Sequence, residues 1–563
     1  MDSGSSQPAQ ETFSELLEEV QEYQDELAED FPDIGLEWEE EKNNNWRVFE
    51  DRLSEIDFSA LDDSASADYI VLKRELEHRM ARYDHHVHLM PVNHNSGPHS
   101  SFVRHPSRQS FNDLEDYEQY IDRLQNASIY FESAKSLLYE GIETGFTAPR
   151  SVLDGHGEMI DSYLVDAPTE SALYEPFESL PKSLSSEERD RIRQAAKTAI
   201  IDEVVPSMEM FREFLLEEYL PETRESHSYA DLPDGETYYE HLVQYYTTRD
   251  VTPEEVHQIG LNEVERIREE MLDVIDESQF DGDFNEFVKY LRTDPQFYSN
   301  SAEELLREAS FIAKRVEGRL PRLFTLDAMP TRPYGVEPVP DDIAPSYYAG
   351  SYSPAATDRD SGSFWINTYD LDSRPLYALP ALFLHEAVPG HHHQIAHSRE
   401  LDDVSQFRQQ NMVTAYIEGW ALYAEYLGQE LDAFDTPYEQ FGRLSNEMWR
   451  ACRLVVDTGI HSKDWTPERA REFMIEHTAL SVHNIRTEVD RYIGNPGQAL
   501  AFKMGEITIR DLREKAEMDL GAEFDIRLFH EVILESGPVP LPRLEDNIRS
   551  WISSQSRTAD SGN

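Results

Sequence analysis

The chain has 563 residues, of which 111 are acidic and 50 basic, and its formal net charge is −61. So large a negative charge argues against binding to nucleic acid or to an anionic membrane. The single cysteine, Cys452, excludes an intrachain disulfide and a cysteine zinc cluster. The N-terminus has no signal-peptide pattern and no apolar run is long enough to span a membrane. We therefore expect a cytoplasmic protein of a high-salt cytoplasm, where salt screens the repulsion between its acids.

Most of the chain shows the apolar spacing of long amphipathic helices. Several helices also carry start signals, in which a Ser or Thr precedes a Glu by three residues or stands directly before a Pro. In chain order, the predicted helices are 13–31, 113–142 and 185–220, the last with a kink at Pro206. Further helices are predicted to start at Thr252 with Glu255, at Ser301 with Glu304, and at Thr466 with Pro467.

Between Pro330 and Asp370, prolines, glycines and aromatic residues replace the helical spacing. This change predicts two or three short strands, of which the clearest is SFWINTY. The expected fold is therefore mainly α, a large multi-helix protein with a small β-sheet just before a histidine-rich motif. The expected regions are a disordered acidic tail at 1–10, a helical region at 11–330, a region with the sheet and the histidine motif at 331–553, and a disordered tail at 554–563.

The stretch HEAVPGHHH, residues 385–393, begins like a zinc-peptidase motif, in which a Glu follows the first of two histidines. His391 and His392 lie six and seven residues after His385, which on a straight helix is about 9–10.5 Å along the axis. Zinc bonds of about 2 Å cannot bridge that distance. Pro389 breaks the helix and Gly390 permits a turn, so one of the two histidines can fold back over the metal. Spacing does not decide between them, and a surface histidine cluster is the alternative.

A third ligand is expected from TAYIEGWALYAEYLG, residues 414–428. Glu418 and Glu425 are seven residues apart in this apolar helix and therefore share a face. A buried glutamate is costly unless it meets a cation or a hydrogen-bond donor. A helix acid at a polar boundary is the alternative for either residue.

These stretches resemble the bacterial and archaeal family catalogued as domain of unknown function 885. Its pattern H-E-x-x-P-G-H-x-x-Q matches from His385 to Gln394, and E-G-W-A-L-Y-x-E matches from Glu418 to Glu425. Three further blocks agree, at residues 453–466, 488–505 and 528–548. The family looks like zinc metallopeptidases of the gluzincin type, related in architecture to thimet oligopeptidase and carboxypeptidase Taq.

The resemblance implies one Zn²⁺ ion, held by His385, His391 and Glu418, with Glu386 as the general base. It also implies a zincin-like fold with a deep central cleft, one wall of which is the helical region 11–330. A cleft of that kind excludes folded proteins, so the expected substrates are short peptides. The oligomeric state is not predicted.

Other residues are candidates for supporting roles in such a reaction. Tyr492 and Arg491 are the expected oxyanion donors, with His461 and Tyr423 behind them. Arg491 has two alternatives, a substrate carboxylate or a buried ion pair. Asp457, four residues before His461, is expected to orient that histidine or to support a zinc-binding one, with a helix-stabilising polar pair as the alternative.

The strand SFWINTY is expected to offer an edge to an extended peptide, with Tyr347 and Tyr352 in a loop over it; aromatic core packing is the alternative. Two other functions compete with a peptidase. One is a zinc amidase or esterase acting on non-peptide substrates, and the other is an inactive metal-binding or scaffold protein. Retention of Glu386 argues against the inactive form.

Overall fold

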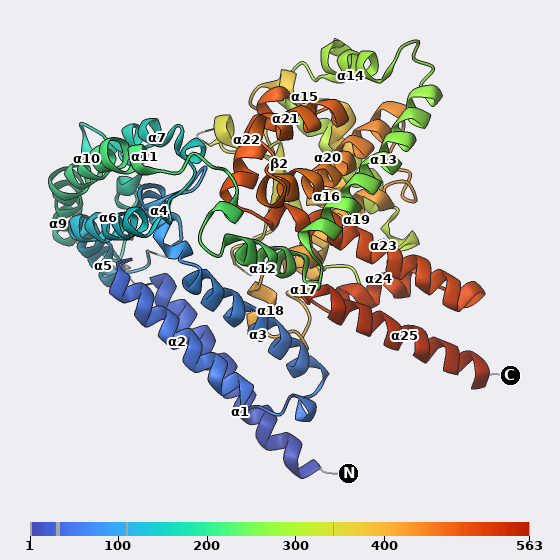
Figure 1. Cartoon of the computed structure of the whole chain (residues 1–563), viewed down its shortest axis with the longest axis horizontal. Helices are drawn as coiled ribbons and strands as arrows, with labels where there is room; N and C mark the ends of the chain where they lie inside the picture. The colour runs from blue at the N-terminus through green and yellow to red at the C-terminus, as the bar shows by residue number, and fades with distance from the viewer. Residues whose placement is uncertain (1–2, 30–33, 109–110, 342, 358, 562–563) are drawn as a thin grey trace. The chain divides into compact units, whose positions relative to one another are not determined.

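The computed structural model describes residues 3–29, 34–108, 111–341, 343–357 and 359–561. Within these residues the protein is mainly helical with one three-stranded sheet, which confirms the expected fold class (Figure 1). The chain forms two compact units. The first comprises residues 1–60, 73–239 and 487–496, and the second comprises 61–72, 240–486 and 497–563. The boundary expected near residue 330 falls inside the second unit.

The first unit is built from helices that the amphipathic pattern largely anticipates. The helices with residues in this unit are α1 (Ser3–Glu29), α2 (Leu36–Ser54), α3 (Asp63–Asp84), α4 (Pro98–Arg104), α5 (Leu114–Gln125), α6 (Ala127–Thr144), α7 (His156–Tyr163), α8 (Glu175–Glu178), α9 (Ser186–Ala199), α10 (Val205–Phe214), α11 (Leu220–Glu222), α12 (Gly235–Thr247) and α22 (Val482–Gly494). The run 113–142 is two helices, because Asn126 leaves helical geometry between them. At Pro206, where a kink was expected, the chain passes through a π-helical turn at Ile200–Val204 directly before α10.

The second unit contains the remaining helices and the sheet. They are α13 (Pro253–Glu277), α14 (Phe284–Thr293), α15 (Ala302–Glu317), α16 (Leu379–Glu386), α17 (His391–Ser398), α18 (Gln406–Gln410), α19 (Thr414–Leu427), α20 (Pro437–Ser462), α21 (Pro467–His477), α23 (Ala501–Leu520), α24 (Ile526–Glu535) and α25 (Leu541–Ser561), with β1 (Tyr334–Pro338), β2 (Gly350–Ser353) and β3 (Gly362–Ile366).

The local start signals work as expected. The side chains of Thr252, Ser301 and Thr466 each accept a hydrogen bond from a backbone N–H three residues on, at the starts of α13, α15 and α21. Residues 3–10 and 554–561, which were assigned to tails, are the ends of α1 and α25; residues 1–2 and 562–563 lie outside the described part.

The sheet has the order β1-β3-β2, with β1 parallel and β2 antiparallel to β3. The three strands confirm the prediction for residues 330–370. The expectation that SFWINTY offers a free edge is wrong, because β3 is the central strand and is bonded on both sides. Both β1 and β2 pair with β3, which follows them in the chain. The local sequence pattern predicts the strands but not which of them pair, so it could not show that β3 is central. The edge nearest the histidine motif belongs to β2, which contacts α16.

Two long-range helix pairs position the motif helices. In Figure 1, α13 and α20 run side by side, and α19 packs along α23. The second pair is unusually close at Gly419 and Gly505. A Cβ on Gly505 would lie 2.0 Å from the carbonyl oxygen of Ala415 and 2.7 Å from the Cα of Gly419. Only glycine permits this approach, and it fixes the helix that carries Glu418, one residue before Gly419.

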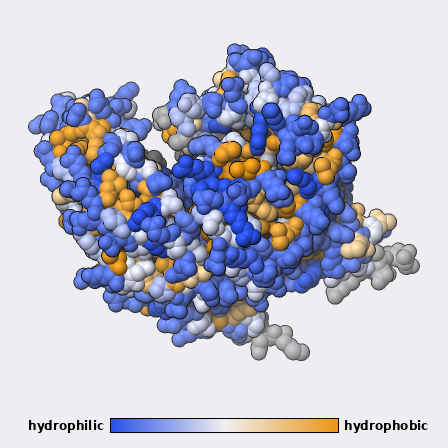
Figure 2. Space-filling model, turned by 45° about the horizontal axis from the view of Figure 1, so that its top comes forward, coloured by the Kyte–Doolittle hydropathy of each residue, from blue (hydrophilic) through white to orange (hydrophobic). Residues whose placement is uncertain are grey.

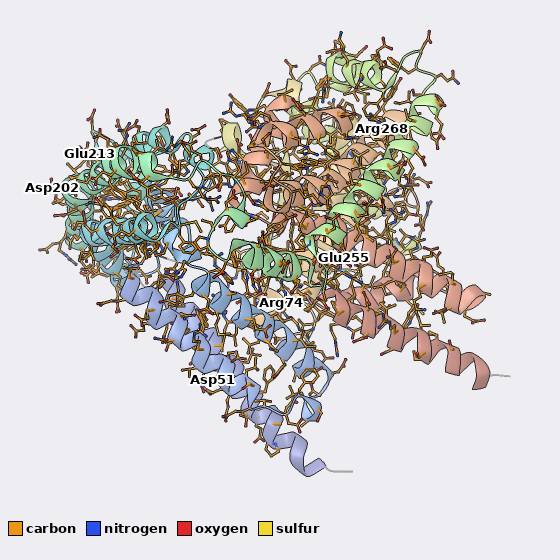
Figure 3. All side chains as sticks on the ribbon, in the orientation of Figure 1. Asp51, Arg74, Asp202, Glu213, Glu255 and Arg268 are labelled. Carbon is orange, nitrogen blue, oxygen red and sulfur yellow. The ribbon has the colours of Figure 1, made fainter. Side chains whose placement is uncertain are left out.

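The acidic residues lie mainly on outward faces. Figure 3 labels Asp51, Asp202, Glu213 and Glu255, which are all exposed on the solvent side of their helices. The face drawn in Figure 2 is correspondingly hydrophilic, with scattered apolar patches. None of the helices in the described part of the chain combines the length and apolarity needed to cross a membrane.

Candidate metal centre

The histidine motif is a helix, a sharp turn and a second helix. α16 ends at Glu386, the peptide bond between Val388 and Pro389 is cis, and α17 begins at His391. The carbonyl oxygen of Pro389 accepts a hydrogen bond of 2.8 Å from the indole N–H of Trp420 on α19. The turn is therefore tied to the helix that carries Glu418.

Gly390 makes this turn possible through close approach rather than a left-handed conformation. Its φ is −78°, which other residues adopt, but its ψ of −131° lies outside the usual regions. A Cβ there would lie 1.9 Å from the carbonyl oxygen of His385 and 2.4 Å from that of Leu384. α17 therefore returns directly against the end of α16.

The turn brings together the three expected metal ligands, His385, His391 and Glu418. Their donor atoms all lie within 4.8 Å of one another. The Nε2 atoms of both histidines are 3.5 Å from the same oxygen, Oε2 of Glu418. The two imidazole rings are nearly perpendicular, with centroids 4.8 Å apart. Three donors thus converge on one point, from α16, α17 and α19.

This group fits a divalent cation on its own geometry. Oε2 of Glu418 is buried and, among the described residues, makes no hydrogen bond, although it faces two ring nitrogens. A buried carboxylate oxygen without a partner is costly. Two imidazoles and one carboxylate are the donor set of catalytic zinc sites that keep a fourth position open.

The electrostatics favour positive charge at the same point. Burial raises the pKa of Glu418, but the facing imidazoles of His391 and His385 outweigh it and hold that pKa well below its usual range. Burial lowers the pKa of His385, yet the carboxylates of Glu418 and Glu425 raise it to about 9. The carboxylates therefore require a positive partner, which an imidazolium or a metal ion supplies.

Glu425 has a role that the sequence analysis left unassigned. Its Oε1 accepts a hydrogen bond of 2.9 Å from Nδ1 of His385, so the other ring nitrogen faces Glu418. The guanidinium of Arg450 lies 3.7 Å from the same oxygen. A carboxylate behind a ligating histidine fixes its tautomer and ring orientation. The seven-residue spacing between Glu418 and Glu425 indicated this position in advance, because it put both acids on the helix face that meets α16.

The next two histidines face elsewhere. Nδ1 of His392 shares a hydrogen bond of 3.1 Å with the hydroxyl of Tyr352, and Nε2 of His393 donates to the carbonyl of Ala328 at 2.6 Å. Burial lowers the pKa of His392 to about 4 and that of His393 to about 3. Both are therefore neutral near pH 7, and the histidine that joins His385 and Glu418 is His391.

Glu386, the expected general base, lies beside the three donors at the end of α16. Its Oε2 accepts a hydrogen bond of 2.8 Å from the backbone N–H of Tyr352. That N–H belongs to β2, the outer strand of the sheet, so the carboxylate is bonded to the sheet while its charge helps to raise the pKa of His385.

Comparison with known proteins places the chain in a family. Residues 17–548 match the family described as "Bacterial protein of unknown function (DUF885)". The chain belongs to this family. The match includes the helical N-terminal half, which the motifs between residues 385 and 548 did not reach. A search of curated proteins found no match.

Two solved structures resemble this DUF885 protein. One is described as a "putative lipoprotein from Colwellia psychrerythraea"; it is 27% identical, covers 92% of each chain and has a TM-score of 0.83. The other is described as a "putative lipoprotein of unknown function from Shewanella oneidensis" and is 17% identical, covering 92% of this chain and 93% of its own, with a TM-score of 0.69. The second likeness shows the shared fold alone.

The remaining candidates are distributed over both units. Arg491 and Tyr492 belong to the first unit, where both donate hydrogen bonds to Oε2 of Glu488, at 2.9 and 2.7 Å. The ion pair that was the alternative for Arg491 is thus present. His461 is fully buried on α20 in the second unit.

Two further polar candidates, Asp457 and Tyr423, make hydrogen bonds within the second unit. Both carboxylate oxygens of Asp457 accept from the backbone N–H of Gly497, at 3.0 and 3.1 Å, so Asp457 holds the turn at residues 495–498. The hydroxyl of Tyr423 lies 2.9 Å from Nε2 of His530 and accepts from Arg513 at 3.2 Å. Tyr423 is therefore committed to a buried network.

A second group of carboxylates has the spacing of a metal site but is already neutralised. Glu263, Glu447 and Glu506 converge on Nζ of Lys503 at 2.9, 2.8 and 2.7 Å. Lys503 is fully buried. Arginines complete the cluster, whose further members are Arg266, Arg443, Arg510 and Glu270. Four cations thus balance four carboxylates, whereas Oε2 of Glu418 faces the imidazoles of His385 and His391.

Proposed function

We propose that this DUF885 protein is a zinc-dependent peptidase of the gluzincin type that hydrolyses short peptides. The observation that carries the proposal is the convergence of His385, His391 and Glu418 on one point, with the carboxylate of Glu386 beside it. This is the donor set and the neighbouring base that metal-assisted hydrolysis requires. The family and its structural relatives have no stated activity, so the proposal depends on the site chemistry.

The three donors would hold one Zn²⁺, which supplies Lewis acidity to polarise a carbonyl and acidify water. Glu386 acts as the general base, taking a proton from the attacking water and returning it to the leaving amine. The N–H of Tyr352 orients this carboxylate. Glu425 keeps His385 aligned. Tyr492, Arg491 and His461 stay predicted catalytic residues, which the variants Tyr492→Phe, Arg491→Lys and His461→Asn test through kcat.

The edge of β2 supports a peptide as the substrate. Because the N–H of Tyr352 points away from β3, the alternation of an antiparallel ladder also turns the backbone of Gly350 outward, while Ser351 pairs inward with Trp365. The N–H of Tyr352 is already bonded to Glu386, so an extended peptide that adds to this edge would bond to the backbone of Gly350 and the carbonyl of Tyr352. It would then lie beside Glu386. A non-peptide amide or ester would not use the edge.

The test is cleavage of a mixed peptide library by the full chain in high-salt buffer, followed by mass spectrometry. We expect cleavage by the wild type, a loss of about 10²-fold or more in Glu386→Gln, and unchanged activity in Glu468→Gln, an exposed acid on α21. Metal analysis should find one zinc ion per chain. No peptide cleavage with full zinc content would contradict the proposal and leave an amidase, an esterase or an inactive metal-binding protein.

We also propose that the protein works in a high-salt cytoplasm. The supporting observation is the net charge of −61, carried largely by exposed helix faces. Fractionation of native cells with an antibody tests this, and recovery in a membrane fraction would contradict it.

A further inference from the structure

Three aromatic side chains form a group on the outer face of the sheet, here called the aromatic ledge: Tyr347, Tyr348 and Trp365. The ring of Tyr347 lies between the other two, with centroids 5.7 Å from Tyr348 and 6.0 Å from Trp365. Tyr348 is 64% exposed, and the other two rings are half-buried. The metal-site chemistry uses none of them.

The register of the sheet shows which face carries the ledge. In β3, Phe364 and Ile366 are buried, and Phe364 packs against Phe383 of α16. Trp365 lies between them in sequence and therefore points to the opposite face. Its register partner on β2 is Ser351, which shares that face.

Hydrogen bonds hold Tyr347 and the backbone of the loop that carries Tyr348. The hydroxyl of Tyr347 lies 2.7 Å from the hydroxyl of Ser351. The fully buried Asn367 donates from its side-chain amide to the carbonyls of Ala344 and Tyr347, at 2.8 and 3.0 Å. The loop before β2 is thus bonded to the end of β3, which places Tyr347 beside Trp365.

The aromatic ledge lies next to the outer edge of β2, the end strand of the sheet. Ser351 directly precedes Tyr352, whose N–H meets Glu386. Side chains of a peptide added to this edge alternate between the two faces of the sheet. Every second one would stand on the outer face, beside Ser351 and the rings of Tyr347 and Tyr348.

We propose that the aromatic ledge is a specificity subsite for a large apolar or aromatic side chain of the peptide substrate. This rests on the proposed peptidase function and names the residues that select its substrate. The hydroxyls of Tyr347 and Ser351 bond each other and so do not favour a polar guest. The exposed carboxylate of Glu337 is on the same face, but it lies on β1, on the side of Trp365 away from β2, and accepts from Ser363. Recognition therefore comes from ring surface, and Tyr348 supplies the exposed part.

The test compares cleavage of peptides that carry Phe, Leu or Ala at each position in turn. The wild type should prefer Phe and Leu over Ala at one position. Because one ring contact is worth a factor of about three to ten, Tyr348→Ala should reduce this preference by that factor. Tyr348→Phe keeps the ring and should retain it. Phe311→Ala removes another exposed ring, on α15, and should leave the preference unchanged.

The outcomes separate this inference from the proposed function. If the wild type cleaves no peptide, the peptidase proposal fails and the subsite fails with it. If peptides are cleaved and Tyr348→Ala keeps the full preference, the subsite alone is refuted. A melting temperature equal to that of the wild type confirms that the exposed substitution leaves the fold intact.

Discussion

Replacing Gly390 by alanine removes no ligand, yet we expect it to disable the metal centre. The added Cβ would lie 1.9 Å from the carbonyl oxygen of His385 and 2.4 Å from that of Leu384. Cβ atoms essentially never lie closer than 3.0 Å to another non-bonded heavy atom, so α17 must move by about 1 Å away from α16. Zinc–nitrogen bonds are about 2.0–2.1 Å long, and a displacement of that size takes His391 out of reach.

The expected loss of zinc affinity follows from the loss of one ligand, His391. Disturbing a residue behind a metal ligand costs about 10–100-fold in affinity, so loss of His391 itself should cost at least about 100-fold. Overpacking should also lower the free energy of unfolding by about 1–3 kcal/mol.

The assay is competition for zinc against a chromophoric chelator in high-salt buffer, with circular dichroism to confirm folding. Gly318→Ala is the matched control, because its Cβ would meet nothing closer than 3.7 Å. A folded Gly390→Ala protein that binds zinc with wild-type affinity would refute the argument that this turn needs glycine to align His391.

Other predictions follow from the same contacts. Glu425→Gln should weaken zinc binding by about 10–100-fold in the same titration. Wild-type affinity would contradict the role of Glu425 in orienting His385. Lys503→Met should lower the unfolding free energy by about 3–5 kcal/mol in denaturant melts, while Lys515→Met, an exposed pair, should change it by under about 0.5 kcal/mol. Gly505→Ala, whose methyl would meet Ala415, should cost about 1–3 kcal/mol; a neutral result would contradict the tight helix crossing. Dilution from about 1 M to about 0.01 M salt lengthens the Debye length from roughly 3 Å to roughly 30 Å. The surface acids then repel one another more strongly, which should lower the melting temperature.

Features that depend on neighbouring residues were predictable from sequence. Thr252 caps α13 because the cap lies within four residues of its partner. The break after Glu386 followed from Pro389 and Gly390 in the same way. The choice of His391 over His392 did not, because it depends on the direction in which α17 leaves the turn. It came from the family pattern, and the structure supplies the reason through the bond of His392 to Tyr352.

Features that depend on packing between distant segments were not predictable. The pairing of β3 on both sides, the position of Glu425 behind His385, and the contact of Asp457 with Gly497 all join residues brought together by the fold. Lys503 is a further example. It lies in a helix with many charges, a pattern that normally indicates a solvated face, yet the side chain is fully buried.

The burial of Lys503 gives the molecule two electrostatic regimes. The outer acids interact through solvent, so their mutual repulsion changes with every change of ionic strength. The ions around Lys503 interact through the protein interior, where dissolved salt does not enter, and their attraction stays constant. Desalting should therefore act on the surface first. The buried ion pairs of Lys503 join α13, α20 and α23. These three helices should therefore be the last part of the second unit to exchange their amide hydrogens.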